Sequence, residues 1–384
     1  MKVLFISSGE YKYGAPKSMM TLIKGLKDEL NVEPILLTKR HSDLNDYCDR
    51  QGIENYSVWY RDIMAGSPYS HKLLTLMKHI VKYLLFLLGG ITQRRVMKLP
   101  IDFSTIDIVH SNTNRQDIGA FIARKHNIKH VWHVRETQKA FNIIFYKKKC
   151  IQYMNQNTDA YIMISKIVQR EWIKQGLLPN LSCVIYDGMD TENIVKKNRK
   201  ISDGNIKVVI IGRIEPNKGQ LQIVQAIAHL PNEIKRKMRL DIIGDAYFDY
   251  RKVIEQVIEE NGIQNQVRFL GFQSNLNERL SEYDIGVTCS KEEGFGRCTI
   301  EYMLAGLLTI ASDTGANPEL IEDGKNGILY KYNDTIHFSE KLKWVIEHDE
   351  ESRNIAEKGY EDASSKYSRK KCADKVYELY QKLL

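Results

Sequence analysis

The stretch Ser290-Lys-Glu-Glu-Gly-Phe-Gly-Arg-Cys-Thr-Ile-Glu-Tyr-Met-Leu-Ala-Gly306 decides how the rest of the chain is interpreted. A strand-like apolar run, Asp284–Cys289, precedes it, and the apolar residues of its second half recur at helical spacing. Glu293 falls before the Gly-Phe-Gly turn, and Glu301 falls on the predicted helix. Two carboxylates therefore flank a junction between a loop and a helix.

Gly294 and Gly296 let backbone N–H groups approach an anion at the positively polarised N-terminus of that helix. A nucleoside-diphosphate sugar suits such a site. Glu293 is suited to accept hydrogen bonds from sugar hydroxyls and Glu301 from a ribose diol, because ionised carboxylates act only as acceptors. From the spacing alone, Glu293 is equally well a helix-capping residue and Glu301 a solvated helix residue.

The surrounding residues favour the first interpretation. Two glutamates separated by seven residues around Gly294-Phe295-Gly296 resemble the mark of the family-4 retaining glycosyltransferases, and the resemblance extends over nearly the whole chain. It implies an α/β GT-B fold, in which two doubly wound Rossmann-like domains face each other across a cleft. In that family the second domain binds the nucleotide-sugar donor, and Phe295 belongs to the donor site.

A second motif lies upstream of the first. The buried-strand pattern Lys207–Ile211 leads into Gly212-Arg-Ile-Glu-Pro-Asn-Lys-Gly219, which resembles the family's diphosphate motif. Arg213 and Lys218 flank one loop, so both cations can converge on one diphosphate. No Asp-x-Asp sequence occurs in the chain, and the two cations supply the charge that Mg²⁺ would otherwise bring. We therefore expect no metal and no cofactor.

The resemblance assigns four further residues. Gly14 and Ala15 lie in a loop that faces the donor diphosphate, although Tyr13 stands where the family commonly has its first glycine. Phe272 is expected near the nucleobase. His133 matches a histidine near the sugar and the leaving phosphate, where an imidazole could titrate near neutrality. Alternatively, Gly14 only relieves strain in a turn and His133 is a hydrogen-bonded polar residue without a catalytic role.

Composition is that of a soluble globular protein: 384 residues, 43% hydrophobic and 27% charged. The six cysteines contain no C-x-x-C pair, which indicates a reducing cytosol and argues against a structural zinc site or a disulfide framework. Residues 1–180 carry a formal charge of +12 from 27 Lys or Arg and 15 Asp or Glu, whereas residues 181–384 carry −4 from 29 and 33. The basic first half could bind a membrane or nucleic acid. Donor motifs in the less basic half argue against nucleic acid.

Residues 71–98 combine many leucines with positive charge and contain no acidic residue. Lysines interrupt the apolar run, so the segment is predicted to lie on an anionic membrane surface rather than cross it. The residues expected to contact the membrane or the acceptor are Lys72, Lys78, Lys82, Arg94, Arg95 and Arg135. In the alternative interpretation the segment packs inside the first domain and its lysines reach out to water.

The predicted domains are an acceptor-binding domain, residues 1–185 with a C-terminal helix at about 368–384, and a donor-binding domain, residues 186–367. The predicted function is metal-independent, retaining transfer of a sugar from a nucleoside-diphosphate sugar, preferably a UDP-sugar, to a lipid-linked saccharide in bacterial surface polysaccharide synthesis. Such an enzyme would act in the cytoplasm, at the inner face of the cell membrane. Two alternatives stay open: a soluble GT-B enzyme that makes a small glycoside or epimerises a nucleotide sugar, and a non-catalytic membrane-binding protein.

Overall fold

The protein is described by a computed structural model that covers residues 1–8, 11, 14–65, 72–137, 143–191, 194–196, 205–246, 248–273 and 276–384. The chain divides into two compact units, Met1–Gly188 with Arg369–Leu384, and Met189–Ser368. The predicted domain boundaries lie within a few residues of these divisions. Each unit is built on its own parallel β-sheet.

The first unit contains a seven-stranded sheet whose strands are all parallel. In spatial order its strands are β3 (Glu54–Ser57), β2 (Glu33–Thr38), β1 (Lys2–Ser7), β5 (Ile108–Ser111), β6 (Lys129–Val134), β8 (Ala160–Met163) and β9 (Ser182–Val184). A separate antiparallel pair joins β4 (Met64–Ala65) to β7 (Ile144–Phe145). Strand order reverses between β1 and β5, where open α/β sheets bind ligands beyond their carboxyl ends.

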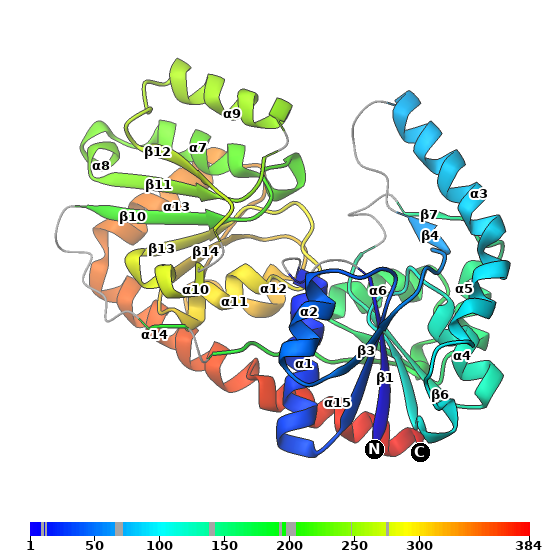
Figure 1. The fold of residues 1–384 in the computed structure, drawn as a ribbon. Coiled ribbons are helices and arrows are strands. Elements are labelled where there is room, and N and C mark those ends of the chain that lie inside the picture. The colour runs from blue at the N-terminus through cyan, green and yellow to red at the C-terminus, as the bar shows by residue number, and fades with distance from the viewer. Residues whose placement is uncertain are drawn as a thin grey trace. The chain divides into compact units, whose positions relative to one another are not determined.

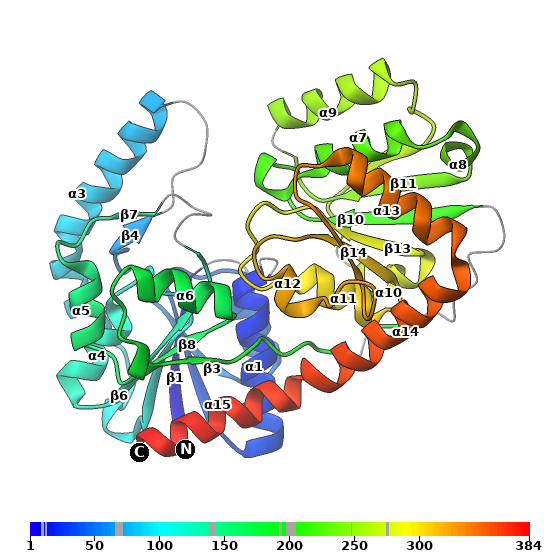
Figure 2. The ribbon, with the colours of Figure 1, turned by 180° about the vertical axis from the view of Figure 1, so that it is seen from behind.

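Helices cover both faces of this sheet (Figure 1). The helices of this unit are α1 (Gly14–Leu30), α2 (Asp43–Arg50), α3 (Lys72–Val96), which projects beyond the sheet, α4 (Ile118–His126), α5 (Cys150–Gln156), α6 (Lys166–Lys174) and α15 (Arg369–Leu383). Because side chains alternate along a strand, Val3 and Phe5 pack with α1 and α15, whereas Leu4 and Ile6 pack with α4. A Cβ on Gly25 would lie 2.9 Å from Cβ of Ala373, so α1 and α15 pack closely side by side (Figure 2).

The second unit contains a six-stranded parallel sheet. Its strands are, in spatial order, β12 (Val267–Gly271), β11 (Met238–Ile243), β10 (Ile206–Ile211), β13 (Ile285–Thr288), β14 (Leu308–Ser312) and β15 (Ile328–Tyr330). Its helices are α7 (Gln220–His229), α8 (Asn232–Arg236), α9 (Phe248–Glu260), α10 (Leu276–Arg279), α11 (Arg297–Leu304), α12 (Asn317–Leu320), α13 (Thr335–Glu347) and α14 (Asp349–Lys366). Strand order reverses between β10 and β13, so the loops that follow these two strands adjoin the position where such sheets bind nucleotides.

The apolar run of β10 is continuous because both faces of this central parallel strand are buried. Val208 and Ile210 enter one buried core, and Val209 enters another on the opposite face. The predicted fold class, two doubly wound α/β domains, is confirmed for each unit. One boundary differs from expectation: α1 begins at Gly14, within the segment we predicted as a loop.

Candidate functional site

Lys218 and Glu293 meet beyond the carboxyl ends of β10 and β13. Lys218 ends the short 3₁₀ turn Pro216–Lys218, and its Nζ donates a hydrogen bond to Glu293 Oε2 at 2.7 Å. The side chain of Lys218 is 28% exposed and that of Glu293 is 19% exposed. Burial lowers the pKa of Lys218, but the Glu293 carboxylate raises it by more, so the net pKa lies above its ordinary value. The lysine is therefore a charged group in a partly water-excluded position.

Two glycines make this approach of the loops possible. Gly219 and Gly315 have left-handed φ angles of 66° and 60°. A Cβ on Gly219 would lie 2.2 Å from the carbonyl oxygen of Cys289, and one on Gly315 would lie 2.4 Å from the backbone nitrogen of Glu293. The Ala316 N–H also donates to the Glu293 carbonyl at 2.9 Å. A side chain at either glycine would thus push apart the loops that position Glu293.

Arg213 is the second cation at the end of β10. Its side chain is 45% exposed, and Nη1 lies 3.9 Å from Glu215 Oε2. The buried Gln220, at the start of α7, donates from Nε2 to the Arg213 carbonyl at 3.0 Å. Gly212 has a φ of 147°, and a Cβ there would lie 3.7 Å from Cδ of Lys218. The structure therefore brings the predicted Gly212, Arg213 and Lys218 to one strand end.

The Gly-Phe-Gly turn leads into α11. Gly296, with a φ of 92°, is the residue before the helix, and Gly294 lies in the loop two residues earlier. Glu301 is only 7% exposed, and Arg297 Nη2 donates to its Oε1 at 3.3 Å. The alternative interpretation of Glu301 as a solvated helix residue is therefore wrong.

Two aromatic residues of the predicted donor site have different environments. Phe295 is 3% exposed, and its ring packs edge-on against Tyr367 with centroids 5.8 Å apart. Its side chain is part of the core, so any contact with a donor would come from its backbone. Phe272 follows β12 and is 53% exposed, which leaves its ring available to a planar ligand.

His133 lies at the carboxyl end of β6 and is 1% exposed. Its Nδ1 lies 3.2 Å from His110 Nε2 and 3.3 Å from Arg135 Nη2. Burial, then the positive charge of Arg135, then His110 hold the pKa of His133 well below its ordinary value. Our expectation that this imidazole titrates near neutrality is therefore wrong, because the buried ring beside an arginine stays neutral.

Arg135 forms a buried ion pair that we did not predict. Its Nη1 donates to Asp187 Oδ1 and Oδ2 at 2.6 and 2.7 Å, and its Nε donates to Asn112 Oδ1 at 2.8 Å. The side chains of Arg135 and Asp187 are 3% and 6% exposed. Burial removes Arg135 from the residues that a membrane can touch. The two residues are 52 positions apart, so local sequence gave no signal for this pair.

Gly14 and Ala15 form the first turn of α1. The first four N–H groups of a helix have no acceptor within it, so this turn can donate hydrogen bonds to an anion. Asn112 Nδ2 donates to the Ala15 carbonyl at 3.1 Å and ties this turn to the end of β5. Tyr13 lies outside the described residues.

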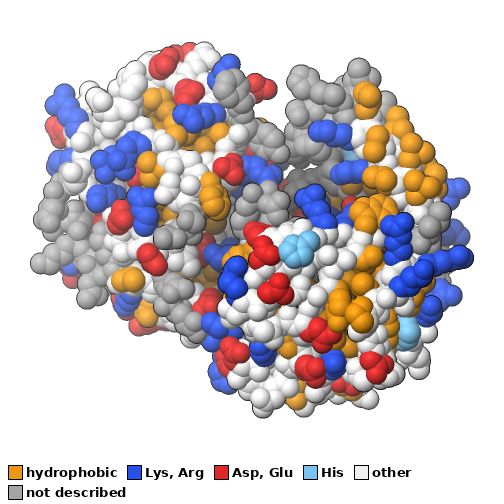
Figure 3. Space-filling view, in the orientation of Figure 1, with side chains coloured by type: hydrophobic (Ala, Val, Ile, Leu, Met, Phe, Trp, Pro, Cys, Tyr) orange, Lys and Arg blue, Asp and Glu red, His pale blue; other side chains and the backbone are white. Residues whose placement is uncertain are grey.

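Helix α3 contacts the first unit along a narrow stripe and turns an apolar face outward. His79 Nδ1 lies 2.8 Å from the Tyr146 hydroxyl, and the Arg61 guanidinium lies 4.6 Å from the centre of the Phe86 ring. The outward residues include Met77, Ile80, Val81, Leu84, Leu87 and Leu88, each between 52% and 58% exposed. Figure 3 shows this apolar surface along the outer edge of α3. These leucines do not pack inside the first unit, so the alternative interpretation is wrong for them.

The basic residues of α3 divide between its two sides. At 3.6 residues per turn, Lys78 and Lys82 fall on the side of His79 and Phe86, opposite the apolar face. Partial burial lowers the pKa of Lys82, as do the nearby Arg115 and Lys39, although Asp62 raises it. Lys82 therefore faces a basic cluster of the first unit rather than the apolar surface.

Arg94 and Arg95 are exposed in the last turn of the helix, and Lys72 is its first residue. Among the residues that the structure describes, no helix is both long and apolar enough to cross a membrane.

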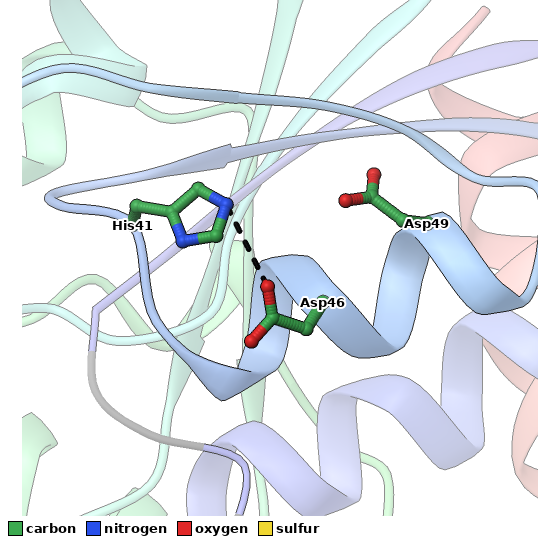
Figure 4. A group of neighbouring side chains, drawn as sticks. All are labelled: His41, Asp46 and Asp49. Atoms are coloured by element: carbon green, nitrogen blue, oxygen red, sulfur yellow. Dashed lines mark ion pairs between the residues drawn. The ribbon is translucent and has the colours of Figure 1, made fainter.

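One group in the described part of the chain has the composition of a metal site. His41, Asp46 and Asp49 have ligand atoms within 4.8 Å of one another, and His41 Nε2 lies 3.7 Å from Asp46 Oδ1 (Figure 4). All three side chains are exposed. Asp49 also accepts a hydrogen bond from Asn55 Nδ2 at 2.6 Å. The group belongs to the first unit.

Comparison with known proteins finds similarity to glycosyltransferases. Residues 190–362 match the family described as glycosyl transferases group 1. The chain is 26% identical over 294 residues to an uncharacterized glycosyltransferase of Methanocaldococcus jannaschii, covering 75% of this chain and 79% of that protein. It is also 23% identical over 327 residues to the capsular polysaccharide biosynthesis glycosyltransferase CapH of Staphylococcus aureus, covering 83% of each chain.

A solved structure shares the fold of the whole chain. The crystal structure of Anabaena HepE in complex with UDP and glucose covers 100% of both chains, with a TM-score of 0.80 and 22% sequence identity. The likeness to HepE concerns the fold alone. The family match covers the segment that contains Arg213, Lys218, Glu293 and Glu301. Residues 190–362 of this chain are thus similar to the glycosyl transferases group 1, and the chain has the two-domain GT-B architecture that the resemblance implied.

Proposed function

We propose that the enzyme transfers a sugar, with retention of configuration, from a nucleoside-diphosphate sugar to a lipid-linked saccharide during bacterial surface polysaccharide synthesis. The observation that carries the proposal is the pairing of Lys218 with Glu293, beside Arg213, where strand order reverses in the second sheet. The capsular role of the relative CapH supports a polysaccharide product. The complex of HepE with UDP and glucose supports UDP as the nucleotide.

In this proposal the donor diphosphate binds to Arg213, Lys218 and the N-terminal end of α11. Arg213 offers a planar fork of donors, and Lys218 offers a compact charge. Gly294 and Gly296 let the backbone approach the phosphates. When the bond from the anomeric carbon to the phosphate oxygen breaks, its electron pair passes to the diphosphate. Cations that are already in place stabilise that growing charge without reorganising.

The remaining donor contacts follow from residue chemistry. Glu293 accepts hydrogen bonds from the donor sugar, and Glu301 accepts from the ribose diol. Phe272, which is half exposed, stacks on the base. The turn at Gly14 and Ala15 donates backbone hydrogen bonds, and His133 donates one from a neutral ring. The acceptor hydroxyl attacks from the face that the diphosphate leaves, and its proton passes to the departing diphosphate, so positioning replaces a protein nucleophile.

We further propose that transfer needs no metal ion. Two cations at the end of β10 can offset the charge that Mg²⁺ neutralises in other phosphate sites. Excess EDTA should therefore leave the initial rate of transfer unchanged. Loss of activity with EDTA, followed by recovery with Mg²⁺ or Mn²⁺, would contradict this. A Asp46→Asn, Asp49→Asn variant would then show whether the exposed group beside His41 is responsible.

Helix α3 suggests how a lipid-linked acceptor reaches the enzyme at the cytoplasmic face of the membrane. Its exposed leucine face suits the hydrocarbon boundary of a bilayer. Lys78 and Lys82, on the opposite side with Lys39 and Arg115 nearby, suit an anionic headgroup such as an acceptor diphosphate. One helix would then contact both the apolar and the charged parts of the acceptor's environment.

The decisive experiment measures thermal shifts of the purified protein with a panel of UDP-, GDP- and ADP-sugars. A ligand at 100 times its dissociation constant stabilises a protein by about 2.7 kcal/mol, so the correct donor should stand out. The selected donor is then incubated with a polyprenyl-diphosphate saccharide or a short soluble acceptor, and the anomeric configuration of the product is read by NMR. An inverted product would refute retention, epimerised donor would favour the soluble alternative, and no donor binding would favour a non-catalytic membrane protein.

A further inference from the structure

Buried polar atoms gather at the carboxyl ends of the strands of the first sheet. Among the described residues, Ser7 Oγ, Asn114 Nδ2 and His133 Nε2 are buried without a hydrogen-bond partner. They lie at the end of β1, just beyond β5 and near the end of β6. Buried polar atoms are nearly always paired in folded proteins, so unpaired ones call for a ligand or another explanation. This edge of the sheet is also where α/β domains bind ligands.

The contacts of His133 determine which of its nitrogens carries the proton. Arg135 Nη2 lies 3.3 Å from His133 Nδ1, and a guanidinium can only donate. His133 Nδ1 is therefore an acceptor. The proton of the neutral ring must then lie on Nε2, the atom without a partner among the described residues.

The same reasoning extends to two more residues. His110 Nε2 lies 3.2 Å from His133 Nδ1, and because Nδ1 accepts, His110 Nε2 must donate. His110 Nδ1 is then an acceptor, and the Tyr380 hydroxyl donates to it at 2.6 Å. Tyr380 and His110 are both fully buried. The chain of hydrogen bonds runs from Tyr380 to His110 to His133, and every donor in it faces an acceptor.

The surroundings keep the imidazole rings of His110 and His133 neutral. Burial, the charge of Arg135 and the proximity of His130 lower the pKa of His110 to about 3. Arg135 is itself held by the buried carboxylate of Asp187. Neither histidine can therefore gain a second proton that would erase the direction of the hydrogen bonds.

We propose that Tyr380 and His110 are positioning residues that hold His133 in its Nε2–H tautomer, so that an uncharged imidazole offers one hydrogen bond to an oxygen of the substrate. This inference rests on the proposed function, because that function makes His133 a substrate contact. Tyr380 belongs to α15, so the last helix of the chain takes part in the active site through two imidazoles.

The first test reads the tautomer directly in the full-length protein labelled with ¹⁵N-histidine. Two-bond ¹H–¹⁵N spectra distinguish Nε2–H from Nδ1–H rings, and the signals of His133 are assigned by their loss in His133→Gln. We expect the Nε2–H pattern for His110 and His133. A charged His133 or an Nδ1–H His133 would overturn the proposal, whether or not transfer can be measured.

The second test uses Tyr380→Phe, which preserves the ring and removes only the hydroxyl. We expect an Nδ1–H population at His110 and His133 and a kcat lower by roughly 10- to 100-fold, the range for losing a group that orients a histidine. KM for the donor should change little. Tyr377→Phe, in the same helix and partly buried, is the matched control and should behave as the parent.

A double-mutant cycle separates positioning from a structural effect. Glutamine at position 133 carries its own N–H donor and has no tautomer, so adding Tyr380→Phe to His133→Gln should not lower kcat further. An undiminished effect in that background would show that Tyr380 acts through the fold and would overturn the proposal. If the parent transfers no sugar from any donor, the proposed function fails, and the spectra still decide the tautomer.

Discussion

At the residue scale, the two cations at the end of β10 differ in how tightly they are paired. Lys218 binds Glu293 at 2.7 Å, whereas Arg213 is more exposed and lies 3.9 Å from Glu215. A diphosphate would compete with Glu293 for Lys218 and leave that carboxylate available to sugar hydroxyls. Lys218, which we assigned to the phosphate, and Glu293, which we assigned to the sugar, therefore act as an ion pair.

The first prediction concerns these cations. Lys218→Ala and Arg213→Ala should each lower kcat by about 10²-fold or more, because diphosphate charge grows toward the transition state. Donor affinity should fall less than kcat. Initial rates over a range of donor concentrations measure both effects. Lys291→Ala, an exposed lysine near Glu293 in sequence, should match the parent, and full activity of either variant would exclude its residue from catalysis.

A second prediction concerns the ribose. Glu301→Gln keeps the size of the side chain but loses charge-assisted hydrogen bonds worth about 1.5–3 kcal/mol, so the donor should bind roughly 10- to 150-fold more weakly. Isothermal titration with the nucleoside diphosphate measures this change. Glu340→Gln, on the exposed side of α13, is the control. Unchanged donor affinity in Glu301→Gln would show that Glu301 binds Arg297 but not the ribose.

At the scale of elements, α3 is an inverted amphipathic helix. An ordinary surface helix turns its apolar face to the core, but this one turns its leucines to solvent, and Lys78 and Lys82 are exposed on its other side. The buried ion pair of Arg61 with Asp117, at 2.7 Å, holds the chain beside Phe86. Exposed apolar patches of this kind mark sites of membrane or protein interaction.

The third prediction tests that surface. Replacing Leu84, Leu87 and Leu88 with Gln should abolish flotation with liposomes, because each buried apolar side chain contributes roughly 1.5–3 kcal/mol. Replacing Arg94 and Arg95 with Gln should weaken binding to anionic vesicles only, with the salt sensitivity expected of surface charge. Ile336→Gln, at an equally exposed residue of the other unit, is the control.

Flotation that survives the leucine substitutions would refute membrane contact by α3. Replacing Lys78 and Lys82 with Gln has a different expected result, because these lysines lie opposite the leucine face. Vesicle binding should persist, and use of the lipid-linked acceptor should fall while transfer to a short soluble acceptor remains.

At the scale of the whole molecule, the first unit keeps several histidines neutral in its interior. Burial lowers the pKa of His110 to about 3 and that of His130 to about 4. In the unfolded chain a histidine takes up its proton near pH 6.5. As pH falls from about 6.5 to about 4, the unfolded state therefore binds protons that the folded state does not, and the free energy of unfolding must decrease.

The fourth prediction concerns this loss of stability at low pH. Urea unfolding monitored by circular dichroism should show stability that falls between pH 7 and pH 5 and is restored when pH rises. His130→Gln should reduce the slope by an amount that grows as pH falls below 6.5 and approaches about 1.4 kcal/mol per pH unit near pH 5, the contribution of one proton. His41→Gln, at an exposed residue, should leave the slope unchanged. An unaltered slope in His130→Gln would mean that His130 is protonated in the folded state.

Features that depend on local pattern could be predicted from the amino-acid sequence. The apolar run of β10 and the order of strands and helices predicted two parallel-sheet domains, and the glycine and glutamate spacing near α11 predicted the family. Such features follow from local sequence, because side-chain periodicity and turn chemistry act over a few residues. The apolar character of α3 was likewise evident, although not the direction in which its leucines point.

Contacts between side chains far apart in the sequence became visible in the folded chain. His110 and Tyr380 are 270 positions apart, and Arg135 and Asp187 are 52 apart. Their contacts depend on the order of strands in the sheet and on the return of α15 to the first unit, which no local window encodes. For the same reason the sequence could not show that His133 is buried beside an arginine. A charge or a tautomer is set by neighbours in space, and the folded chain supplies those neighbours from loops and helices far apart along it.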